Sequence, residues 1–319
     1  GAHLEPFVSL SYIAGCTRRV RLGFTVIVAP YRNPIVTGKM LASLDVLSNG
    51  RLLAGIGAGW LEEEFNALEV PFARRWARTE EHIRIWKELW TADEPKFDGE
   101  YHHFSDVQCR PQPIQKPHPP IFQVGTSSKT FTQAGERGWS VVVGAPTPDD
   151  IFIEPHNIYQ EACARAGTTP HVSFLKAVYL DEDQQRAERD AEEYAMKFIE
   201  YNVSPLKEMN RTEEVKARMR AGGFDFYAGD DFLRLGDVSY QDIVDLGIVY
   251  IGTPEKVANQ LLTLYDKIAF EEFILVSHYG GIPAHKAIQT QELFAKQVLP
   301  LFHTNVRRQL GGLEEIITL

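Results

Sequence analysis

The chain has 319 residues, which is too long for one ordinary domain of roughly 100–200 residues and about right for two domains or for one α/β barrel. Hydrophobic residues make up 44% and charged residues 24% of the chain, so disorder, collagen and coiled coil are excluded for the chain as a whole. Lys and Arg number 33 against 43 Asp and Glu, and the formal net charge of −10 argues against a nucleic-acid partner and an anionic membrane surface.

Membrane and disulfide-rich classes are also disfavoured. The longest apolar runs, such as residues 26–30, fall far short of the ~20 residues that span a bilayer, and the first residues lack a signal-peptide pattern. The three cysteines (Cys16, Cys109 and Cys163) are odd in number and widely spaced, which indicates a reducing compartment. We therefore expect a cytoplasmic protein without a membrane partner.

Short β-rich runs alternate with helical patterns in the first part of the chain. Residues 20–30 form a continuous apolar run closed by a proline, which is typical of a strand buried on both faces. Apolar spacing then predicts a helix over 34–47, a strand over 52–56 and a helix over 79–90. Residues 91–120 are rich in proline, aspartate and aromatic residues and predict an excursion before the next strand.

The alternation continues to the end of the chain. Strands are expected over 121–124, 139–143, 172–180 and 273–277. Residues 126–128 cap a helix that is expected to run to 137, and further helices are expected over 155–166, 183–201, 253–268 and 289–301. Residues 204–250 lose the regular pattern and predict an insertion or a mobile lid, because loops this long in compact domains are usually functional or disordered. Six apolar strands alternating with helices predict a parallel α/β fold, and a doubly wound sheet and a (β/α)8 barrel both fit.

Two motifs follow predicted strands. Gly57, Ala58 and Gly59 lead to Trp60, which stands where a dinucleotide fingerprint has its third glycine. Such small residues let a flat or bulky group approach the strand end, although close packing of the strand on a helix explains them as well. Residues 125–130 open a helix and offer hydroxyls and backbone N–H groups to a phosphate, although an ordinary helix cap has the same pattern.

No metal site is expected. The ten histidines have no metal-ligand spacing, and the adjacent His102 and His103 would point to opposite faces of a strand. The run Glu62, Glu63 and Glu64 is typical of a solvated helix start. Nucleophile-elbow and P-loop motifs do not occur in the sequence.

Three stretches together are more specific than any single motif. Residues 4–65 follow the order strand, proline, Asn-Pro, helix, LDVLSNGR, strand, GIGAGW; residues 119–139 read PPIFQVGTSSKTFTQAGERGW, and residues 294–302 read FAKQVLPLF. The chain closely resembles the bacterial-luciferase-like family of flavin monooxygenases, over nearly its whole length and most densely over 4–140. The resemblance implies a single α/β domain over 1–319, a (β/α)8 TIM barrel with its site at the carboxyl ends of the strands and the insertion at about 204–250 as its lid.

The family normally has two more strands and a helix before the segment that starts here at His3. The resemblance therefore implies a barrel lacking its first two strands, and it leaves the catalytic residue unassigned, because the histidine of the luciferases lies in that part. The family phosphate site would correspond to Gly125, Thr126, Ser127 and Thr130. The flavin ring would lie near Phe24, Thr25 and Val26, where the family often has a non-proline cis peptide, and near Gly57, Ala58, Gly59 and Trp60. Ala58 stands where some members have an arginine that helps to bind the phosphate.

The resemblance implies a monooxygenase that takes reduced FMN from a separate reductase and uses O₂ to oxygenate a small apolar or carbonyl-containing substrate. The lid-like segment favours FMN. A dehydrogenase or reductase that uses a deazaflavin coenzyme is the alternative, and a non-catalytic flavin-binding homologue is a second one. The family dimerises through the helices expected over 5–17 and 35–47, so we expect a homodimer that uses their apolar residues, namely Phe7, Leu10, Ile13, Ile35, Met40 and Leu44.

Overall fold

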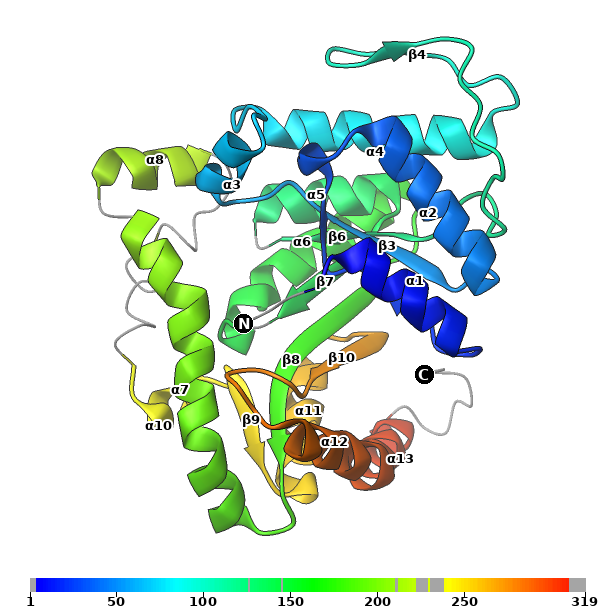
Figure 1. Ribbon diagram of the computed structural model, residues 1–319. Coiled ribbons are helices and arrows are strands. Elements are labelled where there is room, and N and C mark those ends of the chain that lie inside the picture. The colour runs from blue at the N-terminus through cyan, green and yellow to red at the C-terminus, as the bar shows by residue number, and fades with distance from the viewer. Residues whose placement is uncertain are drawn as a thin grey trace. The chain divides into compact units, whose positions relative to one another are not determined.

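The computed structural model describes residues 4–125, 127–144, 146–209, 212–221, 229 and 238–309. The chain divides into two compact units, an N-terminal unit of residues 1–124 and a C-terminal unit of residues 125–319 (Figure 1). Both contain parallel strands and helices, and the N-terminal unit also has one antiparallel hairpin. No helix within the described ranges is long and apolar enough to cross a membrane.

The N-terminal unit is organised around strand β3 (Leu52–Gly57). Its other elements are α1 (Pro6–Cys16), β1 (Leu22–Gly23), β2 (Ile27–Val28), η1 (Ala29–Tyr31), α2 (Pro34–Ser48), α3 (Glu62–Ala67), α4 (Arg75–Thr91), the hairpin of β4 (Phe97–Asp98) and β5 (His103–Phe104), and β6 (Ile121–Val124). β3 pairs in parallel with β1, β2 and β6. The helices α2 and α4 are joined by two buried indoles, because Trp86 Nε1 donates to Pro34 O and Trp90 Nε1 donates to Gly38 O.

The motif LDVLSNGR has a structural role in this unit. The buried Asp45 carboxylate accepts the backbone N–H groups of Ile114 and Gln115, at 2.8 and 3.0 Å, and so anchors the excursion that precedes β6. Arg51 donates to backbone oxygens at and beyond the end of α1, namely those of Ala14, Thr17 and Val20. These polar side chains satisfy backbone groups that would otherwise remain unpaired.

The C-terminal unit is organised around the nine-residue strand β8 (Val172–Leu180). Its other elements are α5 (Ser128–Arg137), β7 (Ser140–Gly144), η2 (Asp149–Phe152), α6 (Ile153–Ala166), α7 (Gln184–Met209), α8 (Glu213–Ala221), α10 (Tyr240–Asp245), β9 (Val249–Gly252), α11 (Pro254–Lys267), β10 (Glu272–Val276), α12 (Ala284–Leu293), the π-helical turn η4 (Phe294–Val298) and α13 (Leu299–Gln309). β8 pairs in parallel with β7, β9 and β10.

The long helix α7 packs against β8 and β9 (Figure 1). It does so through a stripe of residues four positions apart, all at most 3% exposed: Ala187, Ala191, Ala195, Ile199 and Val203. Three of the five are alanines, which let the helix approach the strands closely. Residues on this spacing lie on one face of a helix, so the stripe forms one side of the apolar core of this unit.

Two of the differences from the expected elements concern strands. The strand expected over 20–29 consists of two short strands, β1 and β2, separated by three residues. β9 is an additional strand, Val249–Gly252, at the end of the range 204–250; it follows the short helix α10 after three residues, and its four residues are too few to show a period. Most of the middle of that range, residues 222–228 and 230–237, lies outside the described residues, so the lid stays a prediction.

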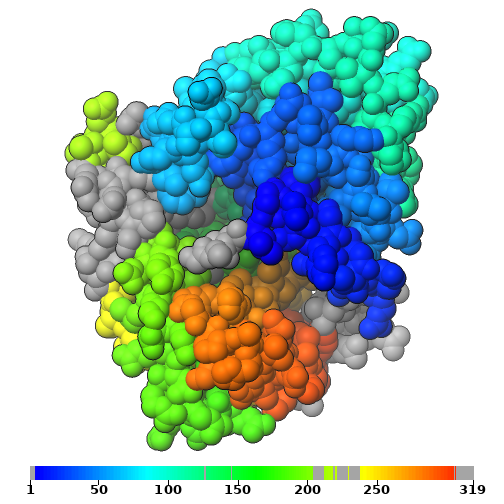
Figure 2. Space-filling view, viewed as in Figure 1, coloured from blue at the N-terminus to red at the C-terminus, as the bar shows by residue number. Residues whose placement is uncertain are grey.

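The apolar residues of α1 and α2 also differ from expectation. Phe7 and Leu44 are buried in the N-terminal unit, at 3% and 1% exposure, and so cannot contact a second subunit. Other apolar side chains of this region are more than 40% exposed, namely Leu4, Val8, Tyr12, Ile13, Val36 and Leu47. Figure 2 shows α1, in dark blue, on the surface of this unit.

A buried ion pair joins three segments of the C-terminal unit. Lys176 on β8 is fully buried, and its Nζ lies 2.5 Å from Asp149 Oδ1 at the start of η2. The same ammonium donates to Gly247 O at 2.7 Å, and Tyr250 Oη on β9 donates to Asp149 Oδ2 at 2.6 Å. Burial lowers the pKa of Lys176, against the opposing effect of the Asp149 charge, and burial together with that charge raises the pKa of Tyr250.

We expect Lys176→Met to destabilise the protein by about 3–5 kcal/mol, because it leaves the Asp149 carboxylate, which is only 15% exposed, without its counter-ion. The matched control is Lys267→Met, which removes the neighbouring pair with Asp150, whose side chains are 44% and 69% exposed. That control should cost at most about 1 kcal/mol. Urea denaturation of both variants measures the difference, and equal losses would show that the buried pair has no special role.

Candidate functional site

The predicted ring-binding segment is a bulge between β1 and β2. Leu22 and Gly23 pair with Leu52 and Leu53, whereas Ile27 pairs with Ile56. Three residues, 24–26, therefore lie opposite two, which is the count of a one-residue bulge. The Thr25–Val26 peptide bond within it is cis, as the family resemblance implied.

The glycines of β3 are needed because this bulge lies so close. A Cβ at Gly55 would come within 1.7 Å of Phe24 O, and a Cβ at Gly57 within 2.7 Å of Val26 Cγ2. Gly59 has φ +80°, and its Cβ would lie 2.8 Å from both Phe65 Cε2 and Val28 Cγ1. Close packing thus explains these glycines, but the neighbours of Gly55 and Gly57 are the bulged strand and not a helix.

The predicted ring-binding residues differ in exposure. Phe24 and Ala58 are 4% and 2% exposed, so their side chains belong to the core of the N-terminal unit. Thr25 is exposed, and Trp60, which follows the left-handed Gly59, is 39% exposed. Thr25 and Trp60 are therefore the two side chains of this group that are most available to a ligand.

The predicted phosphate-binding residues open helix α5. Ser127 is the N-cap, and its Oγ accepts the N–H of Thr130 at 3.2 Å and lies 2.9 Å from Thr130 Oγ1. Gly125 lies directly against this pair, because a Cβ there would be 2.8 Å from Thr130 Cγ2. Thr126 lies outside the described residues.

These contacts give the two hydroxyls different roles. Thr130 is only 5% exposed; its N–H donates to Ser127 Oγ, and its hydroxyl shares a second hydrogen bond with the same atom. Ser127 is half-buried, and with Thr130 as donor its own hydroxyl proton remains available. The N-terminus of a ten-residue helix adds N–H groups and a positive dipole end, so this arrangement fits an anion such as a phosphate.

Arg75, which sequence reasoning did not select, lies beside the glycine loop. It opens α4, is 8% exposed, and its Nε donates to Gly59 O at 2.9 Å. Nearby, Tyr31 Oη donates to Glu64 Oε2 at 2.6 Å, and burial with this contact raises the pKa of Tyr31. Two adjacent arginines at 74–75 were visible in the sequence, but nothing there showed that one of them would be buried.

His82 and His102 form a structural cluster with Glu81 of α4. The Glu81 carboxylate is 2% exposed and accepts the N–H groups of Glu100 and Tyr101, and it lies 2.9 Å from His102 Nδ1. Burial would raise the pKa of Glu81, but the hydrogen bonds from His102 and the two amides outweigh it and lower the pKa. His103 pairs separately with Asp98, so the adjacent histidines have different partners.

His82, next to Glu81, is 3% exposed, and its ring Nδ1 has no hydrogen-bond partner among the described residues. Burial and the neighbouring His102 lower the pKa of His82 to about 4. Within the described part of the chain, no three His, Cys, Asp or Glu side chains are arranged to hold a metal ion.

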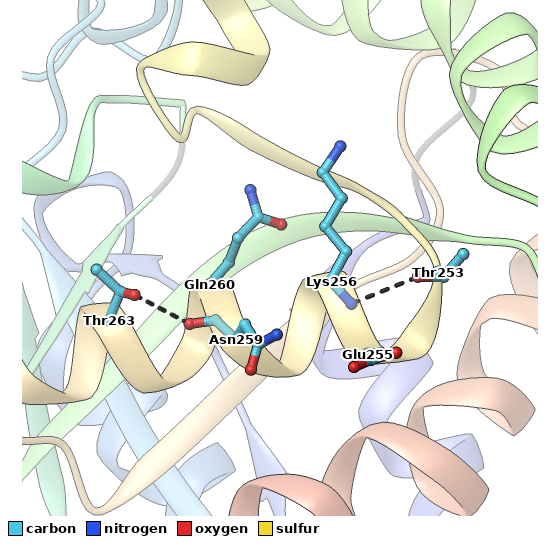
Figure 3. A pocket seen from close by; sticks show the side chains of 6 residues that line it. All are labelled: Thr253, Glu255, Lys256, Asn259, Gln260 and Thr263. Carbon is cyan, nitrogen blue, oxygen red and sulfur yellow. Dashed lines mark hydrogen bonds between the residues drawn. The ribbon is translucent and has the colours of Figure 1, made fainter.

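A surface groove of about 460 Å³ lies along α11 in the C-terminal unit (Figure 3). It is lined by Thr253, Glu255, Lys256, Asn259, Gln260 and Thr263, all on or beside one helix. Thr253 caps the helix by accepting the N–H of Lys256, and Lys256 Nζ lies 3.5 Å from Glu188 Oε1. None of the predicted site residues lines this groove.

Comparison with known proteins identifies the family of the chain. The model of the luciferase-like monooxygenase family matches residues 1–272. The chain belongs to the luciferase-like monooxygenase family. The FMNH₂-dependent dimethylsulfone monooxygenase of Pseudomonas putida is 34% identical over 303 residues, which cover 92% of this chain and 77% of that protein. An uncharacterized protein of Mycobacterium tuberculosis is 34% identical over 167 residues, and this match covers 51% of this chain and only 57% of that relative.

Solved structures of luciferase-like proteins support the fold. The monooxygenase RslO1 from Streptomyces bottropensis has a TM-score of 0.74 at 25% identity, with 93% of this chain and 82% of that chain covered. The coenzyme F420-dependent tetrahydromethanopterin reductase from Methanopyrus kandleri has a TM-score of 0.70 at 19% identity, with 94% and 88% covered, and shows the fold alone. The expected α/β class of the luciferase-like TIM-barrel type is therefore confirmed, while the lack of the first two strands stays a prediction.

The low pKa of His82 makes stability depend on pH. Between pH 6.5, the ordinary value for histidine, and pH 4, the unfolded chain binds a proton that the folded chain does not. Stability should therefore be lost as the pH falls through this window, by up to about 3 kcal/mol. Urea denaturation between pH 7 and pH 4.5 measures the free energy of unfolding at each pH. This free energy should fall less steeply with falling pH in His82→Phe than in the parent protein. His103→Phe, at an exposed histidine, is the control and should retain the slope of the parent.

Proposed function

We propose that this protein is a monooxygenase that uses reduced FMN, supplied by a separate reductase, and O₂ to oxygenate a small organic substrate. The observation that carries the proposal is the hydroxyl pair Ser127–Thr130 at the N-terminus of α5, packed against Gly125. The similarity to the FMNH₂-dependent dimethylsulfone monooxygenase, which extends over 92% of the chain, supports FMN as the cofactor.

The residues present fit this cofactor. The Ser127 hydroxyl and the amides of the first turn of α5 would hold the phosphate, while Thr130 orients Ser127. By the family resemblance, Thr25, Gly57 and Trp60 of the N-terminal unit would adjoin the ring. Reduced FMN, when bound, would supply the two electrons with which O₂ is activated. The chain would bind and orient the flavin and the substrate and exclude water from them.

The deazaflavin alternative is supported only by a likeness of fold, since the F420-dependent neighbour is 19% identical. The deciding experiment measures the binding of reduced FMN and of reduced F420 to the purified protein, and then O₂ consumption with the preferred cofactor. Tight FMN binding with O₂ uptake supports the proposal. Preference for F420 without O₂ uptake would favour the deazaflavin-dependent reductase. FMN binding without any O₂ uptake would favour the non-catalytic flavin-binding homologue.

Three variants of the proposed phosphate site should differ in their affinity for FMN. Ser127→Ala should weaken FMN binding by roughly 5- to 30-fold, the scale of one hydrogen bond to a charged group. Thr130→Val should have a smaller effect, because it only removes the support of Ser127, and Thr130→Ser should bind like the parent. Fluorescence titration with FMN measures each affinity.

Ser128→Ala, at the exposed neighbouring serine, is the control, since both serine variants remove a hydroxyl from the same helix end. Equal FMN affinity of Ser127→Ala and Ser128→Ala would contradict the assignment. Thermal denaturation of each apoprotein separates binding from the loss of the helix cap, which costs about 1 kcal/mol.

We further propose a homodimer that uses the exposed apolar side chains of α1 and α2. Val8, Tyr12 and Val36 are 69%, 75% and 57% exposed, and an interface would remove this apolar area from water. Light scattering at micromolar concentration should give twice the mass of the chain. Tyr12→Asp should shift the protein to monomer, while Tyr201→Asp, at a tyrosine on α7 that is 65% exposed, should not. A monomeric parent protein would contradict the proposal.

A further inference from the structure

The glycine loop of the N-terminal unit is held by a buried charge. Arg75 is the first residue of α4, is 8% exposed, and donates its Nε–H to Gly59 O. The guanidinium carbon also lies 4.0 Å above the centre of the Phe72 ring. Burying a guanidinium is costly unless contacts compensate for it, and the hydrogen bond to Gly59 O and the Phe72 ring are two such contacts.

The same turn is restrained from its other side. Gly59 has φ +80°, and the Phe65 ring and Val28 lie so near that no Cβ would fit there. Phe65 is fully buried and packs edge-on against Tyr31 and Phe72. The left-handed backbone and the packing fix the Cα of Gly59, and Arg75 fixes its carbonyl.

Fixing this carbonyl also fixes the next residue. Gly59 C=O and the Trp60 N–H belong to one planar peptide unit, so a carbonyl held by Arg75 prevents that unit from rotating. The Cα of Trp60 is the next atom of the chain after this peptide unit, and its side chain is 39% exposed. The direction in which the chain presents the indole therefore depends on the Arg75 contact.

We propose that Arg75 is a positioning residue, which holds the Gly59–Trp60 peptide so that Trp60 offers a fixed aromatic face to the flavin. The effect on flavin binding rests on the proposed FMN site, whereas the restraint of the Gly59–Trp60 peptide, the mechanical part, does not. Lysine would be a poor substitute, because an ammonium can donate to the carbonyl but lacks the planar group that stacks on Phe72.

The mechanical part is tested on the apoprotein by hydrogen exchange of the backbone amides of residues 57–61. Arg75→Met should speed their exchange on the order of tenfold over the parent, with Arg75→Lys between the two. The matched control is Arg74→Met: this adjacent arginine is 61% exposed and pairs with Glu100 instead. If Arg75→Met exchanges no faster than Arg74→Met, the proposal is wrong.

The functional part is tested by FMN titration. Arg75→Met and Arg75→Ala should each weaken FMN binding on the order of tenfold. Millimolar guanidinium should restore the affinity of Arg75→Ala, whereas methylammonium should not, and a merely destabilised variant would respond to neither. Unchanged FMN affinity in both variants, or the lack of rescue, would overturn this part. If the parent itself binds no FMN, the cofactor proposal fails, and the exchange measurement still decides whether Arg75 positions the loop.

Discussion

The close approach of the bulge at residues 24–26 to strand β3 constrains the N-terminal unit more than any other contact. Phe24 O occupies the place where a side chain at position 55 would begin, and Val26 occupies that of position 57. Only glycine fits at either place, so the spacing of glycines along β3 follows from the extra residue in the neighbouring strand. The same extra residue divides one continuous apolar run into β1 and β2, and Thr25, at the centre of the bulge, is exposed.

Charged side chains that bond to the backbone hold the irregular segments around this strand. Asp45 anchors the excursion before β6, Glu81 anchors the β4–β5 hairpin, and Arg75 anchors the glycine loop. Each carboxylate or guanidinium is buried and reaches a segment at least 16 residues away along the chain. The unit therefore uses regular packing for its strands and helices, and buried polar contacts for the loops that surround the candidate site.

The sequence predicted what local pattern determines. Buried parallel strands such as β8 were visible as apolar runs, and Asn49-Gly50 marked the end of α2. Features that depend on contacts between distant residues were not visible. Arg75 looked like any arginine in a basic pair, β9 was too short to show a period, and the expected dimer residues Phe7 and Leu44 proved to be buried, because composition does not reveal which face of a helix packs inward.

The glycine loop shows that packing and binding are not competing explanations for one motif. Gly55 and Gly57 are required by the bulge, whatever else the loop does. The strand end that they form is buried, as is Ala58, and the first exposed side chain after it is that of Trp60, at 39%. In our proposal the indole offers its face to a planar ligand, which is favoured when that face is already held in place. Gly59 and Phe65 by their packing and Arg75 by its hydrogen bond would hold it, so the contacts that stabilise the fold here are the ones that would prepare the loop to bind a flavin.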